Sequence, residues 1–312
     1  MDTLKALFKQ PSWVIVFLVG AVFAALPFIT VDKDYHLASH PPTTPLPLVI
    51  GLATMAGALA FAFWQVRGRT AAGADAFGGL DLTSVKASGD ELWTNVNGCE
   101  IRVAFGRIED YRLQPGAAVV LPCNEYFDDR CVGDTRSALG AYANRIFNEH
   151  ATKFAELITH ECKKKWGEGD EQQKTDEERA RSFGVGKCLL LVRPLGNDVP
   201  VALVSTTTQR PGEGLSARIS YMFDGMREVF KHLADARIRE VVMPIIGSGH
   251  GQIDPPMAFV GLLLAIAEAA RYGQGGQRLR KATVVVLKRD AGPVQVDKVV
   301  VRRALALVGS NQ

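Results

Sequence analysis

The sequence predicts an α/β domain that follows two membrane-spanning helices. The first observation is an uneven distribution of charge, because residues 1–66 hold only six of the chain's 36 basic and 33 acidic side chains. The second is the alternation of strand and helix patterns between residues 89 and 312. Such alternation is typical of a mixed, mostly parallel sheet with helices on both faces.

Two apolar runs near the N-terminus have the length of membrane spans. Residues 13–31 and 45–66 contain no charged side chain, and each approaches the roughly 20 residues that cross a bilayer core. Basic residues precede the first run and follow the second, so both termini of this multi-pass protein are expected on the cytoplasmic side of the inner (plasma) membrane. A cleavable signal peptide is the alternative for the first run, and the second run close behind it disfavours that alternative.

Composition divides the remainder of the chain. Residues 1–67 form the predicted anchor, the Ala- and Gly-rich residues 68–88 are expected to form a flexible linker, and residues 89–312 are expected to form a cytoplasmic domain. The net charge is +3 and no dense basic tract occurs, which disfavours a nucleic-acid partner. Five irregularly spaced cysteines indicate free thiols, and no metal site is predicted.

The elements of this domain can be predicted in order. Short strands at 91–96 and 99–106 are joined by an Asn-Gly turn, and a buried strand at 117–122 leads into a polar segment. One long amphipathic helix is expected over 137–163. Further strands are expected at 187–194, 199–207, 239–246 and 281–289, and further helices near 215–235, 256–271 and 296–308.

A charged segment, residues 167–182, interrupts this alternation. It has no apolar face, so a solvated insertion or loop is expected. A subunit contact and a disordered loop are both compatible with its composition.

A glycine-rich loop, GSGHGQIDPP at residues 247–256, follows a buried strand. Its glycines permit close approach of the backbone to a ligand, so their N–H groups can point at anionic oxygens. Asp254 can cap a helix that begins at Pro255 or Pro256. A diphosphate suits such a loop, and a simple strand-to-helix turn is the alternative. The candidate ligand-binding residues here are Gly247, Ser248, Gly249, His250 and Gly251.

A second polar loop, LPCNEYFDD at residues 121–129, follows another buried strand. Loops at the carboxyl ends of strands in open α/β sheets collect ligands, so the two loops are expected to form one crevice. Asn124 offers a donor and an acceptor to a ribose, while Glu125, Asp128 and Asp129 could receive a cation or hydroxyl groups. The alternative is that Asn124 holds its own turn and the acids are solvated.

The LPCN and PIIGSGHG segments, in this order and spacing, resemble the macro domain, an ADP-ribose-binding module. The resemblance covers residues 90–310 and implies that Asn124 occupies the second Asn of the family's NAAN-like loop. It also implies that the glycine loop holds the diphosphate. Arg107 stands where the family has an Asp that reads adenine. The bulky, charged segment 128–140 replaces a glycine-rich run that family hydrolases use, which favours binding over turnover.

Two membrane helices followed by a macro domain with an LPCNxYFD loop resemble the membrane effectors of type II Thoeris antiphage defence. The resemblance implies that a TIR-domain partner makes histidine-ADP-ribose from NAD. It also implies that the effector senses this signal, forms a homo-oligomer and disrupts the lipid bilayer. No cofactor and no catalytic residue is predicted.

Two other functions stay open from the residues. A membrane-tethered ADP-ribosyl hydrolase would need a general base, for which Asp128, Asp129 or His250 are candidates. A membrane scaffold whose α/β domain binds a protein would have no nucleotide affinity. For a receptor, Glu125 and the two Asp residues are expected to face a cationic group attached to the ADP-ribose.

Overall fold

The computed structural model describes residues 29–31, 37–39, 81–114, 116–272, 278–288 and 294–309. The chain divides into two units, Met1–Gly79 and Leu80–Gln312. In the first unit, strands β1 (Ile29–Val31) and β2 (Leu37–Ser39) pair antiparallel. The rest of the predicted spans 13–31 and 45–66 lies outside the described residues. Among the helices that are described, none has the length and apolarity needed to span a bilayer.

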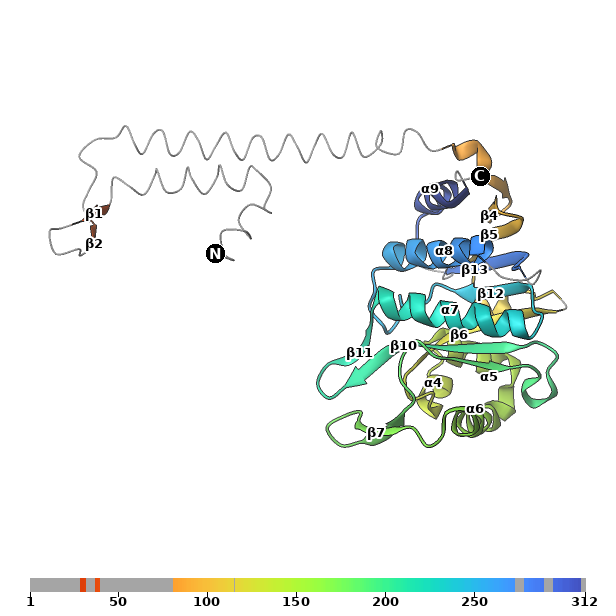
Figure 1. Cartoon of the computed structure of the whole chain (residues 1–312), viewed down its shortest axis with the longest axis horizontal. Coiled ribbons are helices and arrows are strands. Elements are labelled where there is room, and N and C mark those ends of the chain that lie inside the picture. Colours follow the sequence, from red (N-terminus) through yellow and green to blue (C-terminus); the bar gives the residue numbers. More distant parts are fainter. Residues whose placement is uncertain are drawn as a thin grey trace. The chain divides into compact units, whose positions relative to one another are not determined.

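The second unit is built on one mixed sheet (Figure 1). Its order is β11-β10-β6-β12-β13-β5-β4-β3, and β9 also pairs with β10. The five central strands β10, β6, β12, β13 and β5 are parallel, whereas the outer strands pair antiparallel. The strands are β3 (Lys86–Ser88), β4 (Glu91–Val96), β5 (Cys99–Gly106), β6 (Ala117–Asn124), β9 (Cys188–Leu191), β10 (Val201–Arg210), β11 (Gly214–Ala217), β12 (Glu240–Pro244) and β13 (Lys281–Leu287).

Helices cover both faces of this sheet, as the alternating sequence predicts. In β6, Ala118 and Val120 pack in the same hydrophobic cluster as α7, α8 and α9, while Val119 and Leu121 pack with α5 and α6. Successive strand residues point to opposite faces, so β6 is buried on both. The helices are α4 (Asp129–Gly133), α5 (Ala138–Ile146), α6 (Ala151–Trp166), α7 (Ile219–Asp235), α8 (Pro255–Tyr272) and α9 (Lys298–Gly309), with short 3-10 turns at η2 (Leu82–Ser84), η3 (Ile108–Asp110), η4 (Asn148–His150) and η5 (Pro194–Gly196).

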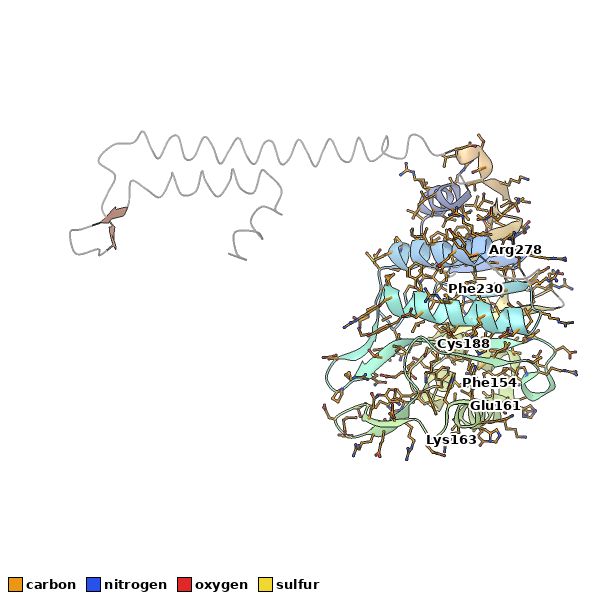
Figure 2. The ribbon with its side chains drawn as sticks, in the orientation of Figure 1. Phe154, Glu161, Lys163, Cys188, Phe230 and Arg278 are labelled. Atoms are coloured by element: carbon orange, nitrogen blue, oxygen red, sulfur yellow. The ribbon has the colours of Figure 1, made fainter. Side chains whose placement is uncertain are left out.

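The expected single helix over 137–163 is wrong, because the chain forms α5 and α6 with a break between them. Asn148 adopts a positive φ of 42° in the break, which a continuous α-helix does not allow. The rings of Phe147 and Phe154 stack at 4.3 Å and hold the two helices together. Along α6, Phe154 points into the core and Lys163 lies at the surface (Figure 2).

Three other segments of the chain also differ from the expectation. The charged residues 167–182 are an ordered hairpin of β7 (Asp170–Gln173) and β8 (Arg179–Ser182). Residues 214–217, expected partly in a helix, form β11. The second compact unit begins at Leu80, and β3, placed in the linker by composition, pairs with β4.

Candidate functional site

A cleft of about 1350 Å³ lies at the carboxyl ends of the five parallel strands. Residues at the ends of β5, β6, β10, β12 and β13 all contribute to its lining. The loop 133–137, which runs from the last residue of α4 to the N-cap of α5, also lines the cleft. The structure therefore brings the predicted Asn loop and the predicted glycine loop into one cleft.

The glycine loop offers backbone N–H groups to this cleft. Gly247 adopts a φ of 84°, and its carbonyl accepts a hydrogen bond from Ile253 N at 3.1 Å. In the described part of the chain, none of the backbone N–H groups of residues 247–251 makes a well-aligned hydrogen bond, and all five residues line the cleft. A run of unpaired backbone donors forms a concave site that suits anionic oxygens.

The contacts around this loop show where glycine is required and how the loop leads into α8. A Cβ at Gly251 would lie 2.8 Å from the carbonyl oxygen of Gly247, so a larger residue would displace the loop. A Cβ at Gly249 would have no atom within 4 Å. The carboxylate of Asp254 accepts a hydrogen bond from Met257 N at 3.3 Å, and α8 begins at Pro255. The predicted helix cap is therefore confirmed.

The Ser248 side chain has a structural role within the loop. Its hydroxyl donates to Ile245 O at 3.0 Å and accepts from Gln295 Nε2 at 2.6 Å. Gln295 also lines the cleft. It follows β13, far from the loop in sequence, and no local motif identifies it.

The Asn124 side chain has one group engaged in its own turn and, among the described residues, one group without a partner at the cleft. The residue is buried, and its Oδ1 accepts hydrogen bonds from Tyr126 N at 2.9 Å and Phe127 N at 3.1 Å. It therefore holds its own turn. Nδ2 has no acceptor among the described residues, and Asn124 lines the cleft. This amide is consequently the part of Asn124 that is free to contact a ligand.

Glu125 does not face the cleft, contrary to the expectation. Its buried carboxylate accepts from Ser182 Oγ at 2.8 Å and from Gln209 N at 3.1 Å, and it pairs with Arg210. These partners connect the Asn loop to β8 and β10. Glu125 therefore holds the loop in place and is not among the lining residues.

Asp128 does not line the cleft either. Its side chain caps α4 by accepting from Cys131 N at 3.4 Å, and it forms an ion pair with the buried Lys174. A cationic ligand group would have to compete with that ammonium. The side chain of Asp129 lies outside the described residues.

An acid that the sequence reasoning missed does border the cleft. Asp134 Oδ2 lies 3.4 Å from His250 Nε2, so the loop 133–137 and the glycine loop meet here. Arg136 donates to Asp134 Oδ1 from its backbone and from Nε, both at 3.0 Å. These hydrogen bonds, with a smaller contribution from His250, lower the pKa of Asp134. Gly140 permits the close approach of this segment, because a Cβ there would lie 2.1 Å from Asp134 O, but the glycine does not identify the acid.

The segment 106–109 brings one positive and one negative side chain to the cleft. Arg107 Nη1 lies 3.4 Å from Glu109 Oε1, and both residues line the cleft. Asp110 pairs with Arg145 at 3.7 Å and is not a lining residue. Glu109 is therefore the acid of this segment that a ligand in the cleft can meet.

A mixed sheet between two helical layers, with the Asn loop and the glycine loop meeting in one cleft, defines a macro-type domain. The family model described as "Thoeris protein ThsA, Macro domain" matches residues 102–287, and the chain belongs to this family. Comparison with curated proteins finds no matching sequence.

Matches among solved structures come from several organisms. A mutant of the Oceanobacillus iheyensis macrodomain has 11% identity and a TM-score of 0.46, covering 70% of this chain and 95% of its own. Thermosipho africanus DarTG in complex with ADP-ribose has 15% identity and a TM-score of 0.43, covering 66% and 46%. The Trypanosoma brucei macrodomain in complex with ADP has 14% identity and a TM-score of 0.41, covering 67% and 68%.

The substitution Glu125→Ala tests the structural role of this carboxylate. We expect the free energy of unfolding to fall by about 1–3 kcal/mol, because Ser182 and the backbone N–H of Gln209 lose their acceptor. Glu125→Gln keeps an acceptor oxygen and should cost less. Denaturant unfolding of the three proteins measures the difference, and an alanine variant as stable as the wild type would contradict the assignment.

Proposed function

We propose that this protein is a receptor for an ADP-ribose-type nucleotide, which binds in the cleft between the Asn loop and the glycine loop. Histidine-ADP-ribose, made from NAD by a TIR-domain enzyme of the same defence system, is the proposed signal. Membership of the Thoeris macro-domain family supports this assignment. The receptor needs no cofactor, because binding alone can shift a conformational equilibrium.

The observation that carries the proposal is the run of unpaired N–H groups at residues 247–251. Their partial positive charge matches the oxygens of a diphosphate. The side-chain charges of the lining support the same conclusion, because Arg107, Arg130 and Arg136 outnumber Glu109 and Asp134. Asn124 Nδ2 adds a neutral donor that suits a ribose hydroxyl.

The response to the signal is proposed from the sequence of the first unit. Residues 13–31 and 45–66 anchor the protein in the inner membrane with both termini in the cytoplasm. Small residues four apart, such as Ala53 and Gly57, permit close helix contact. Ligand binding then favours a homo-oligomer whose assembled spans disrupt the bilayer. Each tenfold difference in ligand affinity between the assembled and the unassembled state shifts the equilibrium between them tenfold.

A second candidate function rests on the Asp134–His250 contact. A histidine oriented by a carboxylate is a general-base arrangement, and this pair borders the cleft at 3.4 Å. A membrane-tethered ADP-ribosyl hydrolase would use it to activate water. The contact is equally suited to closing the rim of the cleft in a receptor.

Calorimetric titration of the full-length chain in detergent tests the receptor. We expect saturable binding of ADP-ribose, tighter binding of histidine-ADP-ribose, and an increase in particle mass by light scattering when the conjugate is added. Absence of heat with either compound would overturn the assignment of the ligand. Binding without any change of mass would overturn the proposed assembly.

The same titration with Gly249→Val tests the glycine loop. The added side chain meets no protein atom within 4 Å of its Cβ position, so the fold should persist while the cleft loses space for the diphosphate. Affinity should fall at least about tenfold, the effect of 1.4 kcal/mol. Ala236→Val, at an exposed position outside the cleft lining, is the control. Unchanged binding by the Gly249 variant would show that the phosphates lie elsewhere.

Chromatography of the nucleotide after prolonged incubation distinguishes the two functions. A receptor should leave histidine-ADP-ribose intact. Release of ADP-ribose and histidine, lost again in His250→Ala, would support the hydrolase and contradict the receptor.

A further inference from the structure

Arg130 borders the cleft but is engaged by a residue of the β7–β8 hairpin. Its side chain is 63% exposed, and its Nη2 lies 2.6 Å from Glu178 Oε2. That oxygen is buried and accepts no aligned hydrogen bond from any described residue. The two groups therefore attract each other by charge, without the directional bond that guanidinium groups form with well-placed carboxylates.

Lys174 fixes Glu178 in this position. The Lys174 side chain is only 2% exposed, and Nζ forms an ion pair with Asp128 and lies 3.4 Å from Glu178 Oε1. The ammonium also lies 5.3 Å from the ring of Tyr126. A buried ammonium is costly to leave unpaired, so Lys174 keeps both carboxylates close. Glu178 is consequently held in place by Lys174 whether or not Arg130 is paired with it.

The four charges of this cluster differ in their access to a ligand. Lys174 is buried and Asp128 is occupied as a helix cap, whereas Arg130 is exposed and lines the cleft. An anionic ligand can therefore recruit Arg130, and in doing so it competes with Glu178. Glu178 is not left without a counter-ion when Arg130 binds the ligand, because Lys174 still pairs with it.

We propose that Arg130 is a ligand-binding residue that Glu178 restrains in the empty cleft, so that the β7–β8 hairpin changes its contacts when an anionic ligand binds. The inference rests on the proposed function and deepens it. It assigns to the charged residues 167–182 a role in sensing occupancy of the cleft. Guanidinium groups bind phosphate and carboxylate oxygens in pairs, so either the diphosphate or a carboxylate of an attached group suits Arg130.

Calorimetry on full-length variants in detergent tests the competition. Glu178→Gln should raise the affinity for ADP-ribose about threefold, the size of a partly exposed ion pair. Arg130→Gln should lower it about tenfold, since one charged contact is lost. In the double variant the Glu178 substitution should have no effect, because its target is gone. Glu171→Gln is the matched control, because Glu171 pairs with Arg179 at 3.4 Å on the same hairpin.

The outcomes separate this inference from the function on which it rests. A wild-type chain that binds neither ADP-ribose nor its histidine conjugate would overturn both. If the wild-type chain binds, two results would overturn the inference alone. One is that Glu178→Gln binds no more tightly than Glu171→Gln. The other is that Glu178→Gln raises the affinity equally in the Arg130→Gln background. A gain confined to the conjugate would identify the carboxylate, and a gain with both ligands would identify the diphosphate, as the partner of Arg130.

Discussion

Parallel pairing of the five central strands is the constraint on which the site depends. Parallel neighbours require a crossover after each strand, so all five carboxyl ends fall at one edge of the sheet. The ends of β5, β6, β10, β12 and β13 therefore line one cleft although they are dispersed over residues 99–287. The helices that make the crossovers bury both faces of the sheet, and they leave this edge as the place where polar loops can gather.

The site divides its polar groups between two tasks. Glu125, Asp128 and the oxygen of Asn124 hold the Asn loop, each through partners within the protein. The groups left for a ligand are mainly backbone N–H groups of the glycine loop, the Asn124 amide and a few arginines. Anion recognition by fixed backbone donors needs little reorganisation on binding. The proposed receptor function and the proposed response of the charged hairpin both fit this division.

Much of the fold follows from local sequence, and the differences have local causes. The Asn97–Gly98 turn has positive φ at both residues, as its dipeptide predicts, and Asp254 caps α8 as expected. Buried strands are identified by their apolar runs. The β7–β8 hairpin is not identified in this way because neither β7 (DEQQ) nor β8 (RARS) contains an apolar run. The structural role of Glu125 cannot be predicted from local sequence, because Ser182 and Gln209 are distant along the chain and no spacing rule links them to the Asn loop.

In the proposed complex, the backbone N–H groups of residues 247–251 receive the phosphates of the ligand. Hydrogen–deuterium exchange of the full-length chain, with and without ADP-ribose, measures these groups directly. They make no well-aligned hydrogen bond to the described residues, so rapid exchange is expected in the free protein and slower exchange when phosphate oxygens bind. Exchange in the segment 245–254 that is unchanged at saturating ADP-ribose would contradict it.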